Sequence, residues 1–189
     1  MPSDIVRTFF AVEVAPPIHA ALVALKAELA QTGAAVRWVR DDGLHATIKF
    51  LGAVRAAMLP AVHAAVAAAA RRTPQLAARV RGLGVFPSPK RPRIFWVGLD
   101  CAELATLAGA LDDALAPLGF APERRAFRAH ITLGRATGTG GREHLHDALE
   151  RHRHDDFGGC TLSELIGYRS DLRRGGALYT KLWTIPFGG

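Results

Sequence analysis

The sequence is poor in cysteine and has no long apolar run. Its 189 residues include only two cysteines, Cys101 and Cys160, and these fit neither a disulfide framework nor a metal-binding motif. No apolar stretch reaches the roughly 18 residues that a membrane-spanning helix needs. The first residues, with Asp4, Arg7 and Glu13, read as a strand rather than as a secretory signal. We therefore expect a cytoplasmic protein with no membrane partner.

Lysine is also scarce, so arginine carries most of the positive charge. The formal net charge is +7, with 24 lysines and arginines against 17 acidic residues. Such a charge fits a polyanionic partner such as a nucleic acid. The alternative is a solvated surface without a partner, because the base composition of the coding DNA can also enrich arginine in an alanine-rich chain.

One four-residue pattern occurs twice, as His45–Ala46–Thr47–Ile48 and as His130–Ile131–Thr132–Leu133. Both copies lie in short runs of alternating apolar residues, which are typical of half-buried strands. Because side chains in a strand alternate between two faces, each histidine shares a face with its threonine.

Basic residues accompany both copies. By the same alternation Lys49 is predicted to share the face of His45, and Arg128 that of His130. Either cation could help to hold a phosphate. Arg7 could reach the same groove or face water, and the sequence leaves both alternatives open.

The two motifs occupy matching places in two similar halves. Each half is predicted to run strand, long helix, histidine strand, second helix, strand. An internal duplication of this kind tends to pack as two similar lobes about an approximate twofold axis. We therefore expect residues 1–189 to form a single bilobal domain of two interwoven lobes, with the two histidine faces meeting across a central groove. Outside the motif runs at residues 44–51 and 129–135, the predicted strands are residues 6–14, 36–40, 76–85, 94–99, 161–168 and 177–185, and the predicted helices are residues 16–33, 58–72, 102–118 and 142–152.

A histidine pair suits general acid and base catalysis on a phosphodiester. The unperturbed pKa of histidine is about 6.5, so at neutral pH one ring can accept a proton while the other donates one. Threonine hydroxyls beside them can stabilise the charge that develops on the phosphoryl oxygens. The structural alternative is that each histidine is an ordinary strand residue, although two copies in matching halves favour catalysis.

A second cluster of histidines lies between residues 142 and 155. His144, His146, His152 and His154 stand there among acidic residues and could hint at a metal site. His144 and His146 are two residues apart and do not share a helix face. We expect a solvated polar helix and no metal.

The paired motifs and their surroundings resemble the 2H phosphoesterase superfamily. Within it, the sequence is similar to the bacterial RNA 2′,3′-cyclic phosphodiesterases, also called 2′-5′ RNA ligase-like proteins. The similar segments are WVRDDGLHATIKFLG at residues 38–52, GVFPSPKRPRIFWVGL at 84–99, FRAHITLGR at 127–135 and YRSDLRRGGALYTKL at 168–182.

The resemblance implies an α+β fold with two antiparallel sheets lining a groove and helices outside. It also implies hydrolysis of RNA 2′,3′-cyclic phosphate ends to 2′-phosphates without a metal or cofactor, by a protein that we expect to be a monomer. His45 would be the proton donor and His130 the proton acceptor, Thr47 and Thr132 would bind the phosphate, and Arg135 matches a family arginine of open role. The alternatives are 2′-5′ RNA ligation in the same groove and a non-catalytic RNA- or nucleotide-binding module.

Overall fold

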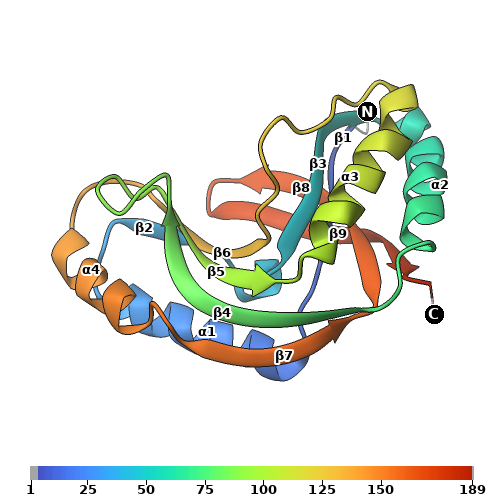
Figure 1. Ribbon diagram of the computed structural model, residues 1–189. Coiled ribbons are helices and arrows are strands. Elements are labelled where there is room, and N and C mark those ends of the chain that lie inside the picture. Colours follow the sequence, from blue (N-terminus) through green and yellow to red (C-terminus); the bar gives the residue numbers. More distant parts are fainter. Residues whose placement is uncertain (1–3, 189) are drawn as a thin grey trace.

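Residues 4–188, the part of the chain that the computed structural model describes, fold into both helices and strands (Figure 1). The α-helices there are α1 Pro16–Gln31, α2 Leu59–Ala70, α3 Glu103–Leu115 and α4 Arg142–Arg151. The strands there are β1 Ile5–Val12, β2 Val36–Trp38, β3 Ala46–Arg55, β4 Leu76–Phe86, β5 Ile94–Asp100, β6 His130–Ala136, β7 Asp156–Leu162, β8 Glu164–Arg173 and β9 Gly176–Pro186. Short 3-10 turns precede β3, α2 and the loop that leads to β6.

The strands form one antiparallel sheet in the order β7-β4-β5-β6-β3-β1-β8-β9, and β2 pairs with β6. The α+β class is therefore confirmed. The two separate sheets that the resemblance implied are instead joined into one. The reason is a single residue pair at the centre, Ala46 of β3 opposite Ile131 of β6, which links β3, β1, β8 and β9 to the other five strands.

The helices bury one face of this curled sheet. Helix α3 packs against α2 and β3, while α1 packs against α4, β2 and β7. In α1 and α3 the leucines that recur every three or four residues are almost completely buried, as an amphipathic helix requires. Figure 1 shows α2 and α3 at one end of the molecule and α4 at the other, with α1 running along the lower side. The opposite face of the sheet is called the site face below.

Two predicted boundaries were wrong. Gly52 does not end the first histidine strand, because it adopts a φ of 72° at a register shift and β3 continues to Arg55. The predicted strand at residues 161–168 is two strands that meet at Ser163, with β7 pairing β4 and β8 pairing β1. The glycines at positions 158 and 159 hid β7, since glycine contributes no side chain to the alternation.

None of the helices in residues 4–188 combines the length and the apolar character that crossing a membrane requires.

Candidate active site

The pair that joins the two halves of the sheet also brings the two motifs together. Ala46 and Ile131 are both fully buried toward the helices, so their neighbours in sequence point to the site face. Extended by one residue, this antiparallel register sets His45 opposite Thr132, and Thr47 opposite His130. The histidines are then diagonal neighbours, with roughly 7 to 8 Å between their Cα atoms.

A β-bulge follows each motif threonine. The partners in β1 skip from Thr47 directly to Lys49, and the partners in β5 skip from Thr132 directly to Gly134. The fourth residue of each motif is therefore the extra residue of a bulge. The two halves match not only in sequence but also in this local irregularity.

The bulges reverse the alternation for the residues that follow. Phe50 comes to the site face, where it stacks with Phe9 at a centroid distance of 6.3 Å. Arg135 occupies the corresponding place after the second bulge. Lys49 turns to the helix side, so the prediction that it shares the face of His45 was wrong.

Lys49 is instead the centre of a buried anchor. Its ammonium group pairs with the Asp112 carboxylate of α3 at 2.5 Å and donates a hydrogen bond of 2.8 Å to the carbonyl oxygen of Ala121. The same carboxylate accepts a hydrogen bond from the backbone N–H of Glu123 at 2.9 Å. The ammonium group of Lys49 therefore binds α3 and the loop before β6 rather than a phosphate.

Aromatic rings enclose His45. Its ring stacks on Phe9 and Tyr168, with centroid distances of 4.9 and 5.5 Å, and meets Tyr179 edge-on at 5.0 Å. Its Nδ1 atom is buried and has no hydrogen-bond partner among residues 4–188. Burial lowers the pKa of His45 to about 4, although the Glu13 carboxylate acts in the opposite direction. In the free protein this imidazole is therefore neutral at neutral pH.

Glu13 stands behind this aromatic cage. It accepts hydrogen bonds from the Tyr168 hydroxyl and, at 2.8 Å, from the Lys181 ammonium group. Burial raises the pKa of Glu13, but the hydrogen bonds from Lys181 and Tyr168 outweigh it and leave the pKa lowered. Glu13 is therefore a carboxylate at neutral pH and keeps a negative charge near His45.

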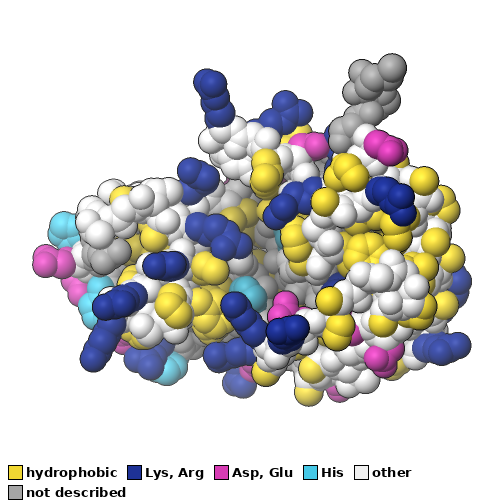
Figure 2. Space-filling view, turned by 90° about the horizontal axis from the view of Figure 1, so that it is seen from above, with side chains coloured by type: hydrophobic (Ala, Val, Ile, Leu, Met, Phe, Trp, Pro, Cys, Tyr) yellow, Lys and Arg dark blue, Asp and Glu magenta, His cyan; other side chains and the backbone are white. Residues whose placement is uncertain are grey.

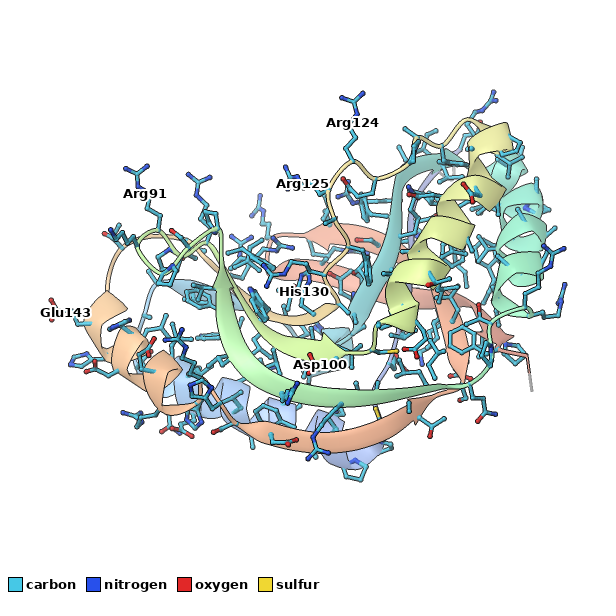
Figure 3. The ribbon with its side chains drawn as sticks, viewed as in Figure 1. Arg91, Asp100, Arg124, Arg125, His130 and Glu143 are labelled. Atoms are coloured by element: carbon cyan, nitrogen blue, oxygen red, sulfur yellow. The ribbon has the colours of Figure 1, made fainter. Side chains whose placement is uncertain are left out.

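His130 is held differently. Its Nδ1 atom lies 2.7 Å from the carbonyl oxygen of Arg128. A carbonyl only accepts, so Nδ1 carries the proton and donates it, which leaves the lone pair of the neutral ring on Nε2. Phe86 and Trp96 meet the ring edge-on, with centroid distances of 5.2 and 6.2 Å. These residues line a hollow beside the ring, and Figure 3 shows His130 in the middle of the molecule.

The predicted arginines lie on the site face. The guanidinium of Arg128 is 5.7 Å from the Phe86 ring and 6.0 Å from the Trp96 ring, the two rings that contact His130. Arg135 and Arg7 both lie close enough to Tyr179 to oppose the rise that burial causes in its pKa. Arg7 also lies over Phe50, 4.6 Å from the ring centroid, and its side chain is exposed, so it contacts the site face while facing water.

Two of the histidines between residues 142 and 155, His146 and His154, line the same hollow as His130. His152 pairs with Glu28 and Asp155 through its two ring nitrogens. In the part of the chain that the structure describes, no group of three or more histidine, cysteine or acidic side chains is arranged to hold a metal ion.

Sequence reasoning missed the aromatic surroundings of the histidines. Phe9 comes from β1, far in sequence from Tyr168 of β8 and Tyr179 of β9, and the convergence of these rings on His45 depends on strand order. Composition carried one signal, since the chain has only two tyrosines and both contact this histidine.

The chain is similar to proteins of one family along almost its whole length. A family model described as LigT-like phosphoesterase matches residues 12–96 and 98–179, with one motif in each segment. A protein of Aeropyrum pernix named RNA 2′,3′-cyclic phosphodiesterase is 30% identical over 166 residues, which are 87% of this chain and 93% of that protein. One of the same name from Methanothermobacter thermautotrophicus is 30% identical over 178 residues, 94% of this chain and 96% of that protein.

Solved structures agree with this fold. The crystal structure of TT0787 of Thermus thermophilus superposes with a TM-score of 0.82 at 26% identity, covering 95% of this chain and 97% of that one. The crystal structure of E. coli LigT complexed with 3′-AMP gives a TM-score of 0.78 at 26% identity, covering 97% and 98%. Both motifs fall within the matched segments, and the chain belongs to the LigT-like phosphoesterase family.

Proposed function

We propose that this chain hydrolyses the 2′,3′-cyclic phosphate at the end of an RNA to a 2′-phosphomonoester, with His45 as proton donor and His130 as proton acceptor. The observation that carries the proposal is the register of β3 against β6, which sets two histidines and two threonines on one face of one sheet. The names of the relatives from Aeropyrum pernix and Methanothermobacter thermautotrophicus support the same substrate.

His130 has the tautomer that a general base needs. With Nδ1 donating to the carbonyl of Arg128, Nε2 is free to take a proton from water. The oxygen of that water forms the new bond to phosphorus. The bond from phosphorus to the 3′ oxygen breaks, so the phosphate stays on the 2′ oxygen.

His45 delivers the proton that the leaving 3′ oxygen needs. In the free protein its pKa of about 4 leaves it unprotonated. A phosphodiester anion at the site favours the imidazolium, because an opposite charge within about 4 to 6 Å raises a histidine pKa. Binding of the substrate therefore raises the fraction of His45 that carries the proton.

The remaining groups stabilise the phosphoryl oxygens. Thr47 is exposed and Thr132 half-buried, one beside each histidine, so each hydroxyl can donate to a non-bridging oxygen. Arg128 and Arg135 add positive charge on the site face. Fixed donors aimed at developing charge are usually the largest contribution to such catalysis.

E. coli LigT has been crystallised with 3′-AMP, a nucleotide, and with phosphate, which supports a nucleotide phosphate at this site. We further propose that the protein acts as a cytoplasmic monomer on RNA or oligonucleotides, as the sequence predicts.

The test is turnover of a 2′,3′-cyclic mononucleotide by His45→Ala and His130→Ala variants. Each substitution should lower kcat by about 10² to 10⁴, the range for loss of a general acid or base. The product of the unaltered protein should carry its phosphate on the 2′ oxygen, and a chelator should not abolish turnover. His144→Ala, on the exposed surface of α4, is the control.

Other outcomes would contradict the proposal. A variant with near-normal kcat would remove that histidine from the mechanism. Tight RNA binding by the unaltered protein without turnover would favour the non-catalytic module. Joining of a cyclic-phosphate RNA to a 5′-hydroxyl RNA, in preference to hydrolysis, would favour the ligase.

A further inference from the structure

Two basic loops flank His130. One is residues 87–93, between β4 and β5, and the other is residues 119–129, which lead into β6. Figure 3 shows Arg91 on the first loop and Arg124 and Arg125 on the second, with His130 lower down and between them. In the space-filling view from above, lysine and arginine side chains gather around the hollow (Figure 2).

The arginines of these loops differ from many others in lacking acidic partners. Within residues 4–188, the side chains of Arg91, Arg124 and Arg125 are exposed and form no ion pair or hydrogen bond. Elsewhere, some exposed arginines pair with carboxylates, among them Arg40, Arg79, Arg81, Arg153 and Arg169. The uncompensated charge above His130 therefore attracts an anion.

The loop at residues 119–129 is also fixed at its base. Lys49 and Asp112, the buried anchor described above, hold the backbone at Ala121 and Glu123. The Glu123 side chain in turn accepts hydrogen bonds from the backbone N–H groups of the next two residues, at 2.9 and 3.2 Å. A buried ion pair adds little net stability, so its evident effect here is to define where this irregular loop lies.

We propose that Arg124 and Arg125 bind backbone phosphates of the RNA strand upstream of its cyclic end, so that the protein prefers oligoribonucleotides to mononucleotides. The inference rests on the proposed function, because it needs the cyclic phosphate to lie between His45 and His130. The loop leads directly into β6, with Arg125 five positions before the histidine. A strand that leaves the hollow past this loop brings its phosphodiesters to two unpaired guanidinium groups, which bind phosphate bidentately.

The test compares two substrates in two double variants. The substrates are a 2′,3′-cyclic mononucleotide and a ten-nucleotide RNA that ends in a 2′,3′-cyclic phosphate. The test variant is Arg124→Ala with Arg125→Ala. The matched control is Arg71→Ala with Arg72→Ala, two adjacent exposed arginines at the end of α2, which remove the same charge far from the loop.

The test variant should raise KM for the ten-nucleotide RNA about tenfold at low salt, and its slope of log affinity against log salt should shrink by about 1.4, the value for two lost contacts with a single strand. Its kcat, and both constants for the mononucleotide, should match those of the unaltered protein. For both substrates, the control variant should change KM and kcat by no more than the loss of two positive charges from the protein explains.

Three outcomes separate the two proposals. An unchanged KM for RNA in the test variant, or an equal rise in the control, would overturn the role of the loop while leaving the proposed function intact. An equal rise in KM for the mononucleotide would also overturn it, since the arginines would then act at the cyclic phosphate itself. Failure of the unaltered protein to turn over either substrate would instead defeat the proposed function.

Discussion

At the residue scale, the two histidines of the site are held by opposite means. A carbonyl fixes the tautomer of His130, whereas His45 lies among aromatic rings with an unpartnered Nδ1 atom. The first arrangement prepares a base before substrate arrives. The second favours a neutral ring until an anion is bound. The donor role of His45 and the acceptor role of His130 remain the proposal made above, and the tautomer of His130 is the observation that favours it as the acceptor.

This difference predicts how His45 titrates. In the free protein its ring signals should titrate at about pH 4. Saturating inorganic phosphate should raise that midpoint by about 1 to 3 units, because an adjacent anion stabilises the imidazolium. Nitrogen-detected NMR of the imidazoles measures both values, and the signals of His144 on α4 provide the control. A free-protein midpoint near the ordinary value of about 6.5 would contradict the prediction.

The residue types of the site could be predicted from sequence, but not all of their directions. Alternation with a period of two places Thr47 with His45 correctly, because no irregularity lies between them. It fails at Lys49, because a bulge intervenes. Bulges depend on the partner strand, which a single strand's pattern does not reveal. The aromatic cage was missed because it is assembled from three strands.

At the scale of elements, one histidine outside the site ties the end of α4 to α1. His152 donates through Nε2 to Glu28 of α1 at 2.9 Å and through Nδ1 to Asp155 at 2.6 Å. Both partners are carboxylates, so the ring is charged when both bonds form. Burial lowers the pKa of His152, but the hydrogen bonds to Glu28 and Asp155 outweigh it and leave the pKa raised.

Because the pKa of His152 is raised in the folded protein, its charged ring stabilises the fold at low pH, and this stabilisation is lost at high pH. The contribution of His152 is complete below the unfolded value of about 6.5 and disappears as the pH rises through the higher folded value. Urea unfolding should show His152→Gln less stable than the unaltered protein by roughly 1 kcal/mol at about pH 6, and nearly equal to it at about pH 9. His154→Gln, a neighbouring exposed histidine, should show no such pH-dependent difference. If the loss of stability in His152→Gln were as large at about pH 9 as at about pH 6, the charged ring of His152 would not be its cause.

Most elements could be predicted from the sequence because their periodicity is strong. The leucines of α1 and α3 recur at helical spacing and are buried as expected. β7 was missed because its glycines break the pattern, and β3 is longer than predicted because Gly52 does not end it. In both cases pairing with a neighbouring strand decided the outcome.

At the scale of the whole molecule, helices from each half of the chain pack on strands from the other half. α3 lies between β5 and β6 in sequence but packs on β3 and α2, while α1 follows β1 in sequence but packs on β7 and α4. Each half of the chain therefore helps to bury the other half's strands. That the chain is a single bilobal domain formed by internal duplication remains a prediction. The packing supports it, because strands in each half of the chain are covered by a helix from the other half.

Interlocked lobes should unfold together. Leu111 of α3 is fully buried, and its replacement by alanine should cost about 2 to 5 kcal/mol of unfolding free energy. Two single-tryptophan backgrounds distinguish the lobes, since Trp183 of β9 stacks on Phe10 of β1, whereas Trp38 of β2 packs near Phe95 of β5. In urea titrations Leu111→Ala should lower the midpoint equally in both backgrounds, although α3 is packed on the strands beside Trp183. If the midpoint fell in the Trp183 background alone, the two lobes would be separately folding units, because a cavity in α3 would then leave the strands around Trp38 unaffected.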